Sequence, residues 1–248
     1  MRALFCLLPA CMLTAGELRI AVASNAEAAF SALSEKFEAT HDIRVIRVSG
    51  STGRHHAQIV HGAPFDLLFA ADAETPLRLR ESGHAAAVGT YAYGVLVLWS
   101  PHPGRVNGAG DVLRRAEFRR LAVANAAVSP YGRAAEEVLS ALEVNNTLRP
   151  RIVRGSNIGQ TAHFVSSGAA DLGFVALSQI REPEQEDLPG SYWFPPADMY
   201  SPLEQKWALI NDTPAARSFL LFLQTPEARE LLLGYGYTLP ESDAPDPG

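Results

Sequence analysis

The sequence predicts an α/β protein. Short apolar runs that suit strands alternate along the chain with longer segments in which apolar residues recur at helical spacing. Several apolar runs end on serine, asparagine or glycine immediately before such a helical segment. Strands that alternate with helices favour mainly parallel sheets covered by helices. The 248 residues, 47% of them hydrophobic, are enough for one large core or two smaller cores.

Strand-like runs occur in eight places, and helical periodicity fills most of the gaps between them. The expected strands cover residues 18–23, 43–48, 65–70, 93–99, 121–124, 151–153, 171–176 and 206–210. Helices are expected over residues 26–40, 133–143 and 160–167, with two more within 214–234. In the first helix, Phe30, Leu33 and Phe37 share one face. Residues 181–196 are charged and rich in proline, which predicts an exposed connection.

Two of the apolar runs suggest a division into two lobes. If the runs near residues 93–99 and 206–210 both cross between lobes, residues 95–196 form a second lobe inserted into the first. The first lobe then combines residues 17–94 with residues 197–248. The pattern alone also permits a single doubly wound sheet.

Residues 1–16 resemble a secretory signal peptide, because a basic start is followed by an apolar stretch that ends in small residues. Both cysteines, Cys6 and Cys11, fall in this segment, so its removal leaves a chain without thiols, which suits an oxidising compartment. A weak lipoprotein-like pattern before Cys11 makes lipid anchoring the second option. No later stretch of the sequence is apolar and long enough to span a membrane.

The net charge limits the classes of partner. It is −6, with a pI of about 5.6, which does not suggest a nucleic-acid-binding protein. A modest negative charge still allows an anionic ligand, because local dipoles decide that binding.

Four segments place hydroxyls, an amide or glycines at the expected starts of helices. Such ends have unpaired backbone N–H groups and the positive end of the helix dipole, and both attract anions. Each segment alone also fits an ordinary N-cap or turn, but the four together predict a site for a small oxyanion. The segments are Ser24-Asn25, residues 49–53 with Ser51 and Thr52, residues 130–132 with Tyr131, and residues 155–159 with Ile158. Residues 49–53 lack the lysine and spacing of a P-loop, so a nucleotide is not expected.

Catalytic motifs are missing from the sequence. Neither G-x-S-x-G nor H-E-x-x-H occurs. A secreted hydrolase that uses Ser24 or Ser51 is the rival from a different class, but no histidine lies near either serine in a recognisable motif. We therefore expect no catalytic residue.

A protein-bound metal cation is also not expected. His55, His56 and His61 lie close together in the sequence, and two aspartates follow. Neighbouring residues of a helix point in different directions, so a solvated helix surface is the favoured interpretation of these histidines.

Four longer motifs span most of the chain in a fixed order. They are AVASN (21–25), GSTGRHHAQIVHGAPFDLLFAAD (50–72), SPYGRAAEEVL (129–139) and ADLGFVALSQI (170–180). With them the chain resembles the periplasmic molybdate-binding proteins of ABC importers over essentially its whole mature length. The resemblance implies a type II solute-binding fold, in which two lobes, each a mainly parallel sheet flanked by helices, are joined by a two-strand hinge. The oxyanion is then held in the cleft between the lobes.

The resemblance also implies which residues bind the ligand. The family's ligand positions fall here on Ser24, Asn25, Ser51, Thr52, Tyr131 and Ile158. Asn25 matches the subgroup that has asparagine there, and Ser51 enters as the neighbour of Thr52. Some members use a tyrosine hydroxyl at the position of Ala176, so that donor is absent here.

The implied ligand is molybdate, or tungstate of nearly the same size, with no cofactor. The implied partner is a membrane permease. We also expect the protein to be located in the periplasm and to be a monomer. Sulfate or thiosulfate is the rival ligand, and a sensor that presents its closed form to a signalling partner is a further rival function.

Overall fold

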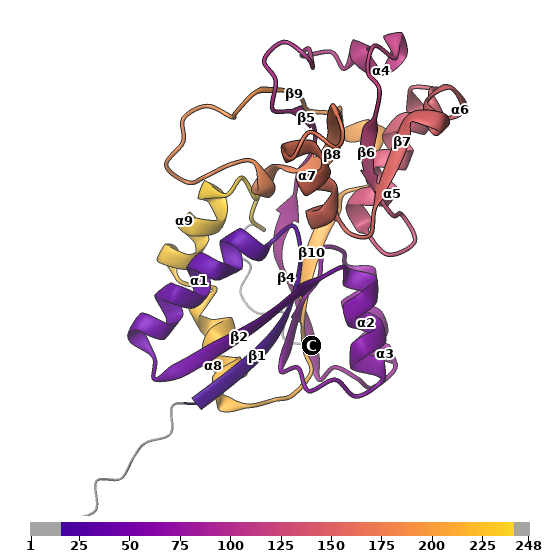
Figure 1. Cartoon of the computed structure of the whole chain (residues 1–248). Helices are drawn as coiled ribbons and strands as arrows, with labels where there is room; N and C mark the ends of the chain where they lie inside the picture. Colours follow the sequence, from indigo (N-terminus) through magenta and orange to yellow (C-terminus); the bar gives the residue numbers. More distant parts are fainter. Residues whose placement is uncertain (1–15, 241–248) are drawn as a thin grey trace, which may run out of the picture.

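The structure is a computed structural model that describes residues 16–240. It contains two five-stranded sheets, one above the other in Figure 1, with helices packed on their faces. The expected signal peptide lies outside the described residues except for Gly16, which begins the first strand. No helix within residues 16–240 is long and apolar enough to cross a membrane.

The first sheet has the strand order β2-β1-β3-β10-β4. Strand β1 pairs in parallel with β2 and β3, whereas β10 runs antiparallel to β3 and β4. One face is covered by α1, α8 and α9 and the other by α2 and α3 (Figure 1). The strands are β1 (Gly16–Ala23), β2 (Ile43–Gly50), β3 (Leu67–Phe69), β4 (Ala87–Gly94) and β10 (Leu203–Leu209). The helices are α1 (Glu27–Thr40), α2 (Thr52–Val60), α3 (Glu74–Glu81), α8 (Pro214–Phe222) and α9 (Pro226–Gly234).

The second sheet repeats this pattern with the strand order β7-β6-β8-β5-β9. Strand β6 pairs in parallel with β7 and β8, and β5 runs antiparallel to β8 and β9. The strands are β5 (Leu96–Ser100), β6 (Leu121–Ala124), β7 (Ile152–Gly155), β8 (Leu172–Ala176) and β9 (Ser191–Trp193). The helices are α4 (Asp111–Arg115), α5 (Pro130–Ala141), α6 (Asn145–Leu148) and α7 (Ile158–Ser166), and short 3₁₀ turns cover 149–151, 177–179 and 197–199.

Two connections join the sheets. The chain leaves the first sheet after Gly94, enters the second at Leu96, and returns between Trp193 and Leu203. The predicted α/β fold with two lobes is therefore confirmed, and a single doubly wound sheet is excluded for this chain.

The expected strand over residues 93–99 is wrong as one strand. Gly94 ends β4, which pairs with β10 of the first sheet, and Leu96 begins β5, which pairs with β8 of the second. A single residue, Val95, separates the two strands and is itself apolar, so periodicity does not mark the change of sheet. The part of β4 before Tyr93, AVGTYA, has too little apolar character to be expected as a strand.

The expected exposed connection over residues 181–196 is also partly wrong. It contains β9, which adds an edge strand to the second sheet by pairing with β5. Trp193 of β9 is only 6% exposed and packs into the core. A strand of three residues is too short to show a period in the sequence.

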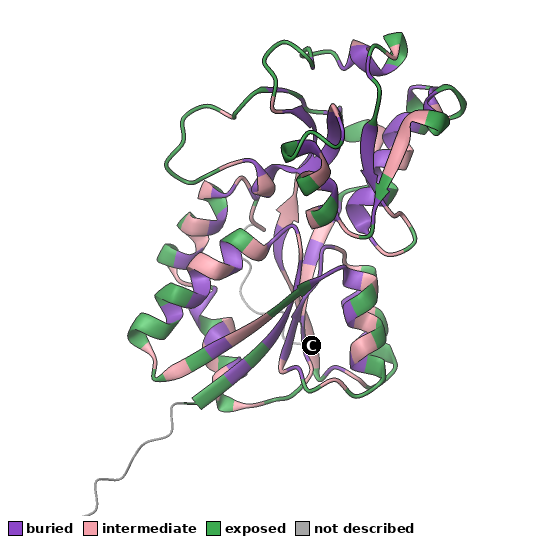
Figure 2. Ribbon diagram, viewed as in Figure 1, coloured by how far each residue is buried: buried purple, intermediate pink, exposed green. Residues whose placement is uncertain are grey.

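The core of the first lobe centres on aromatic rings. Phe30 is fully buried, and its ring centroid lies 4.3 Å from that of Phe69, 5.6 Å from Tyr91 and 6.4 Å from Phe219. Figure 2 shows buried residues along the inner strands and exposed residues on the outer faces of the helices, whereas the edge strand β2 is mostly exposed or intermediate. The face of α1 expected from Phe30, Leu33 and Phe37 is the buried face, as predicted.

Replacing Phe30 by alanine should lower the free energy of unfolding by about 3–5 kcal/mol, because a fully buried ring is removed from a packed aromatic cluster. Urea unfolding measures the change. Leu221→Ala is the matched control, since Leu221 lies on α8 beside Phe219 but is 65% exposed, and it should change stability by less than about 0.5 kcal/mol. Equal effects of the two substitutions would contradict the packing described here.

Candidate functional site

Four helix starts from the two sheets meet where the sheets face each other. Helices α1 and α2 follow the parallel strands β1 and β2, and α5 and α7 follow the parallel strands β6 and β7. Ligands of open α/β sheets bind beyond the carboxyl ends of such strands. The Gly159 N–H donates to Ser24 Oγ at 3.2 Å, and the Gly53 N–H donates to the Val128 carbonyl at 3.3 Å. These bonds join the start of α7 to the end of β1, and the start of α2 to the loop before α5.

Ser24 and Asn25 do not cap α1. The N-cap of α1 is Ala26, which makes no side-chain capping bond. The simple N-cap interpretation of the Ser24-Asn25 pair is therefore wrong, and both side chains are free for other contacts. Ser51 does act as a cap, since its Oγ accepts the Arg54 N–H at 3.3 Å at the start of α2.

Three hydroxyls of the site make the same kind of hydrogen bond. The oxygens of Ser24, Ser51 and Thr52 each accept a backbone N–H, and for Thr52 the donor is Ala71 at 3.0 Å. Within residues 16–240 no hydrogen bond takes up the proton of any of these hydroxyls. A hydroxyl whose oxygen is engaged in this way directs its proton elsewhere. The three side chains therefore present O–H donors.

Three backbone N–H groups are also unpaired. Thr52 begins α2, Ile158 begins α7, and Tyr131 is the second residue of α5. No hydrogen bond of the described residues uses the N–H of any of the three. They belong to the first turn of each helix, where intrahelical acceptors are missing and the helix dipole is positive. All three residues are at most 3% exposed, so the groups are withdrawn from bulk water.

Asn25 lies in a buried polar network behind these donors. Its Nδ2 is 3.1 Å from Gln205 Oε1, 3.1 Å from the Tyr237 hydroxyl and 3.5 Å from the Tyr131 hydroxyl. Its Oδ1 is buried and has no hydrogen-bond partner. The Tyr91 hydroxyl donates to Gln205 Oε1 at 2.7 Å. The network thus connects Asn25 to the hinge-side strands β4 and β10 and to α5.

The tyrosines of this network stay protonated at neutral pH. Burial raises the pKa of Tyr91, Tyr131 and Tyr237 well above the ordinary tyrosine value. Each hydroxyl therefore has one proton to donate and lone pairs to accept. The polar groups around Asn25 are all uncharged.

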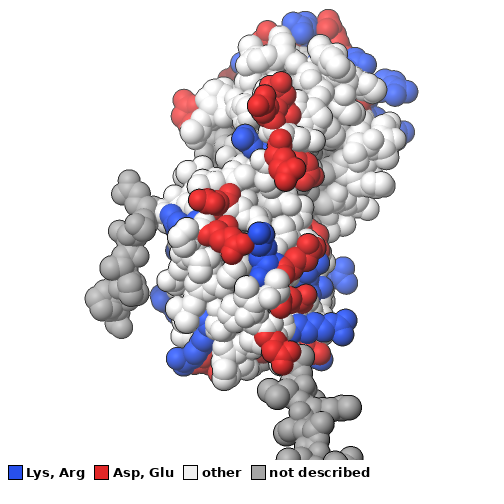
Figure 3. Space-filling view, turned by 90° about the vertical axis from the view of Figure 1, so that its left-hand side faces the viewer, with Lys and Arg blue, Asp and Glu red and all other residues white. Residues whose placement is uncertain are grey.

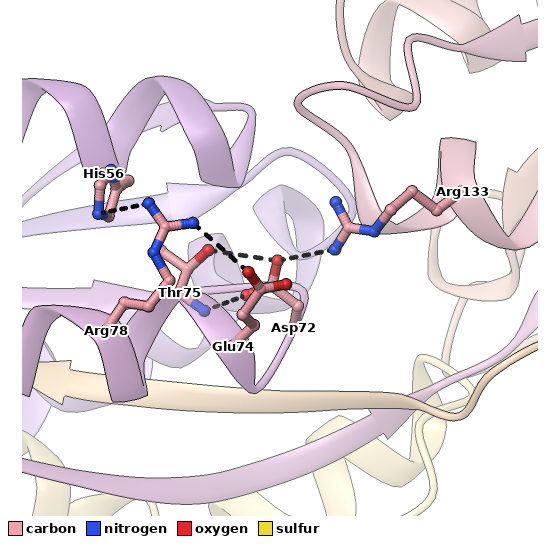
Figure 4. A network of polar contacts seen from close by, with 6 residues as sticks. All are labelled: His56, Asp72, Glu74, Thr75, Arg78 and Arg133. Atoms are coloured by element: carbon pink, nitrogen blue, oxygen red, sulfur yellow. Dashed lines mark hydrogen bonds and ion pairs between the residues drawn. The ribbon is translucent and has the colours of Figure 1, made fainter. Parts of the chain in front are cut away.

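Charged residues flank the site and are paired with each other. Arg133 extends from α5 toward Asp72, and its Nη2 lies 3.2 Å from Asp72 Oδ2 (Figure 4). Asp72 also accepts the N–H and the hydroxyl of Thr75 in the first turn of α3. The face shown in Figure 3 mixes basic and acidic side chains and has no broad basic surface. The donors of the candidate site are hydroxyls and backbone N–H groups, which are neutral.

One cavity of the structure has a mainly acidic lining and does not suit an anion. It measures about 470 Å³ and lies beside the ion pair of Asp72 and Arg133. Glu137 and Glu204 also line it, so its walls have three carboxylates and one guanidinium. Such a lining repels a dianion.

The site contains no catalytic pair. Among the described residues, no histidine is hydrogen-bonded to Ser24 or Ser51, and no group of three or more His, Cys, Asp or Glu residues could hold a metal ion. The sequence suggested that His55 lies on a solvated surface, but its side chain is buried, with 1% exposed. Its Nε2 lies 3.1 Å from the Val22 carbonyl oxygen, and its Nδ1 lies 3.0 Å from Gln58 Oε1. The correction follows from the packing of α2 on the first sheet, which sequence spacing does not reveal.

Sequence reasoning missed the residues behind Asn25. Gln205 and Tyr237 lie 180 and 212 residues from Asn25. Gln205 stands between Glu204 and Lys206 in the strand sequence LEQKWAL, so no local signal marked it as a buried residue. Gly159 is the other missed contact, although it stands in a segment that the sequence indicated.

Comparison with known proteins agrees with this geometry. A family model described as a bacterial extracellular solute-binding protein matches residues 18–238. The chain belongs to this family. It is therefore a solute-binding protein and not an enzyme, and the resemblance found from the sequence motifs is confirmed.

Two relatives are close in sequence. The chain is 40% identical over 235 residues to the molybdate-binding protein ModA of Azotobacter vinelandii, which covers 93% of both proteins. It is 39% identical over 228 residues to ModA of Rhodobacter capsulatus, covering 90% of this chain and 88% of the relative.

Solved structures extend the comparison. The Azotobacter vinelandii periplasmic molybdate-binding protein superposes with a TM-score of 0.87 at 38% identity, covering 90% of this chain and 100% of that one. The sulfate-binding protein SubI of Mycobacterium tuberculosis H37Rv superposes with a TM-score of 0.71 at 17% identity, which shows a shared fold only.

His55 should make stability depend on pH. Burial lowers its pKa below the unfolded value of about 6.5, so the unfolded chain binds the proton more readily. The free energy of unfolding should therefore be highest above pH 6.5 and should fall as the pH drops through 6.5 toward the lowered folded pKa. Urea unfolding at pH 7.5 and 5.5 measures this loss.

His55→Gln should reduce the loss of stability, because its amide keeps a donor for the Val22 carbonyl without titrating. His163→Gln removes an exposed histidine and is the control, which should leave the loss unchanged. If His55→Gln has the same pH dependence as the unmodified protein, His55 is not the group responsible.

Proposed function

We propose that this protein captures molybdate between its two lobes and delivers it to the permease of an ABC importer. The observation that supports this most directly is the set of donors described above. Ser24, Ser51 and Thr52 supply hydroxyl protons, and Thr52, Tyr131 and Ile158 supply N–H groups from three helix starts. Asn25 is the sixth residue of the proposed site. The relatives named ModA support the choice of ligand.

The chemistry of the donors suits a tetrahedral dianion. Molybdate has four acceptor oxygens and no proton near neutral pH, so a site made of donors alone matches it. Helix starts from both sheets stabilise its charge without a counter-ion. The ligand can also leave at low cost, since no buried charge is left unpaired when it goes.

Selection among oxyanions depends on size. Sulfate has the same shape and charge as molybdate, so hydrogen-bond pattern alone does not separate them. A cavity fitted to the larger ion leaves some donors out of reach of sulfate oxygens, and each unmade bond in a buried site is costly. Tungstate has nearly the same size as molybdate and should bind as well.

We assign residues 17–94 and 197–248 to the first lobe and residues 95–196 to the second. The protein acts in the periplasm as a monomer, after removal of an export signal within residues 1–16. The proposed donors come from both lobes, so the ligand should be enclosed when the lobes approach each other.

Molybdate and tungstate should raise the melting temperature, whereas sulfate at the same concentration should have little effect. A ligand at about 100 times its dissociation constant adds roughly 2.7 kcal/mol of stability by mass action. A thermal-shift panel of molybdate, tungstate, sulfate and phosphate tests this. Stabilisation by sulfate, with none by either metal oxyanion, would overturn the assignment.

Ile158→Pro should weaken molybdate binding by about 1.5–3 kcal/mol, the range for a hydrogen bond to a charged group. Proline at the first position of a helix removes one N–H and is otherwise tolerated. The preceding residue, Asn157, has φ −154° and ψ 175°, which is the extended conformation that proline requires of its neighbour. Calorimetric titration with molybdate measures the affinity.

Ile158→Val is the matched control, because it keeps the N–H and most of the side chain. It should bind molybdate within about threefold of the unmodified protein. Equal affinity of the proline and valine variants would remove the Ile158 N–H from the site.

A further inference from the structure

Two buried amides, those of Asn25 and Gln205, face each other where the two lobes meet. Gln205 is fully buried on β10, at a break in the pairing of β10 with β4 between Gln205 and Lys206. Such irregularities redirect side chains. Gly94 of β4 packs directly against the Tyr131 hydroxyl and Gln205 Nε2, and a Cβ at Gly94 would collide with both. The amide pair is therefore enclosed on the hinge side.

The hydrogen bonds of this pair leave two groups unsatisfied. Asn25 Nδ2 donates to Gln205 Oε1, and both Asn25 Nδ2 and Gln205 Nε2 point at the oxygen of the Tyr131 hydroxyl. No hydrogen bond of the described residues takes up the proton of that hydroxyl. Asn25 Oδ1 has no donor. Buried polar groups without hydrogen-bond partners cost free energy, so an arrangement that pairs them would be more stable.

Turning both amides by 180° gives a partner to the Tyr131 hydroxyl proton and removes the unpaired oxygen of Asn25. Gln205 Nε2 then faces Asn25 Oδ1 at the 3.1 Å now spanned by the opposite bond, and the Tyr131 hydroxyl donates to Gln205 Oε1 at 3.0 Å. Gln205 Nε2 also reaches the Tyr91 hydroxyl, which accepts because its own proton goes to the Ala70 carbonyl. Every protein partner in this part of the network is satisfied.

The Tyr237 hydroxyl permits the same turn. It now donates to the Asn25 carbonyl at 3.2 Å, but the Ser178 hydroxyl donates to that carbonyl at 2.8 Å. The Tyr237 proton is thus free to move to Asn25 Oδ1. Turning only one amide would place two oxygens or two N–H groups against each other, so the two amides must turn as a pair.

The turned pair leaves one group in need of an outside partner. Asn25 Nδ2 then occupies the place of Oδ1, which makes no hydrogen bond to any described residue. An N–H₂ group at that place requires an acceptor, and an oxyanion consists of acceptors. Asn25 Oδ1 at the same place would repel it.

We propose that Gln205 is a positioning residue which, by turning its amide together with that of Asn25, makes Asn25 a donor to the bound oxyanion. This inference rests on the proposed function. Gln205 does not touch the ligand and acts through Asn25. The same pair contacts Tyr131 of α5, so the turn also couples the oxyanion to the second lobe.

Gln205→Glu tests the proposal. A carboxylate has acceptors only, so it holds Asn25 Nδ2 toward residue 205 and keeps Asn25 Oδ1 toward the oxyanion. Calorimetric titration at pH 8.5 should show molybdate affinity lowered on the order of 30-fold, within the range for one lost bond to a charged group. Gln205→Met has similar length and no polar atom, leaves Asn25 free to turn, and should lower affinity less than tenfold.

A double-mutant cycle separates this mechanism from simple charge repulsion. Asn25→Ala should by itself lower molybdate affinity about 10–150-fold. In the Asn25→Ala background, Gln205→Glu should lower affinity by less than about threefold further. A full additional loss there, or a Gln205→Met variant as weak as Gln205→Glu, would overturn the proposal.

The unmodified protein and the melting curves serve as controls. If the unmodified protein does not bind molybdate, the proposed function fails, whereas normal binding by Gln205→Glu refutes only the role of Gln205. Should Gln205→Glu fail to fold, Gln205→Met gives a second test. Because Gln205 acts through Asn25, any loss of affinity caused by Gln205→Met in the Asn25 protein should be absent in the Asn25→Ala background, and an equal loss there would overturn the proposal.

Discussion

The structure depends on unpaired backbone N–H groups that helix starts from two separate sheets direct to one place. An N–H buried without an acceptor destabilises the protein, so such groups are retained only where a partner is to be supplied. Parallel strands end at the same edge of a sheet, and each sheet places two helix starts there. Thr52 lies on α2, which packs on the first sheet. Tyr131 and Ile158 lie on α5 and α7, which pack on the second. An acceptor-only ligand therefore satisfies both lobes at once.

The proposed site offers an anion only neutral groups, and the contacts around it are consistent with that proposal. Ser24, Ser51 and Thr52 each receive a backbone N–H, which fixes the direction of their own protons. Arg133 is the cation on the helix that provides Tyr131, and Asp72 holds it in an ion pair outside the donor set. A free guanidinium would bind any anion strongly, whereas directed N–H and O–H groups respond to the size of the ion.

Local patterns in the sequence predicted most of the fold and pointed to the helix starts from which the candidate site is built. Strand ends followed by Ser24-Asn25 or by Ser51-Thr52 are visible because the strand, the turn and the helix are neighbours in the chain. The division at Gly94 and the edge strand β9 were not predictable, since pairing with distant strands defines them. The partners of Asn25 were missed for the same reason. His55 is buried only because α2 packs on β1.

The hinge side of the molecule joins residues that are far apart in the sequence. Gln205 stands on the strand that returns from the second lobe, and Gly94 ends the strand that leads into it. Their side chain and backbone enclose the amide of Asn25 and the hydroxyl of Tyr131, one from each lobe. Any change in the angle between the lobes must move these groups relative to each other. Ligand contact and lobe position therefore share the same hydrogen bonds, and by linkage each biases the other.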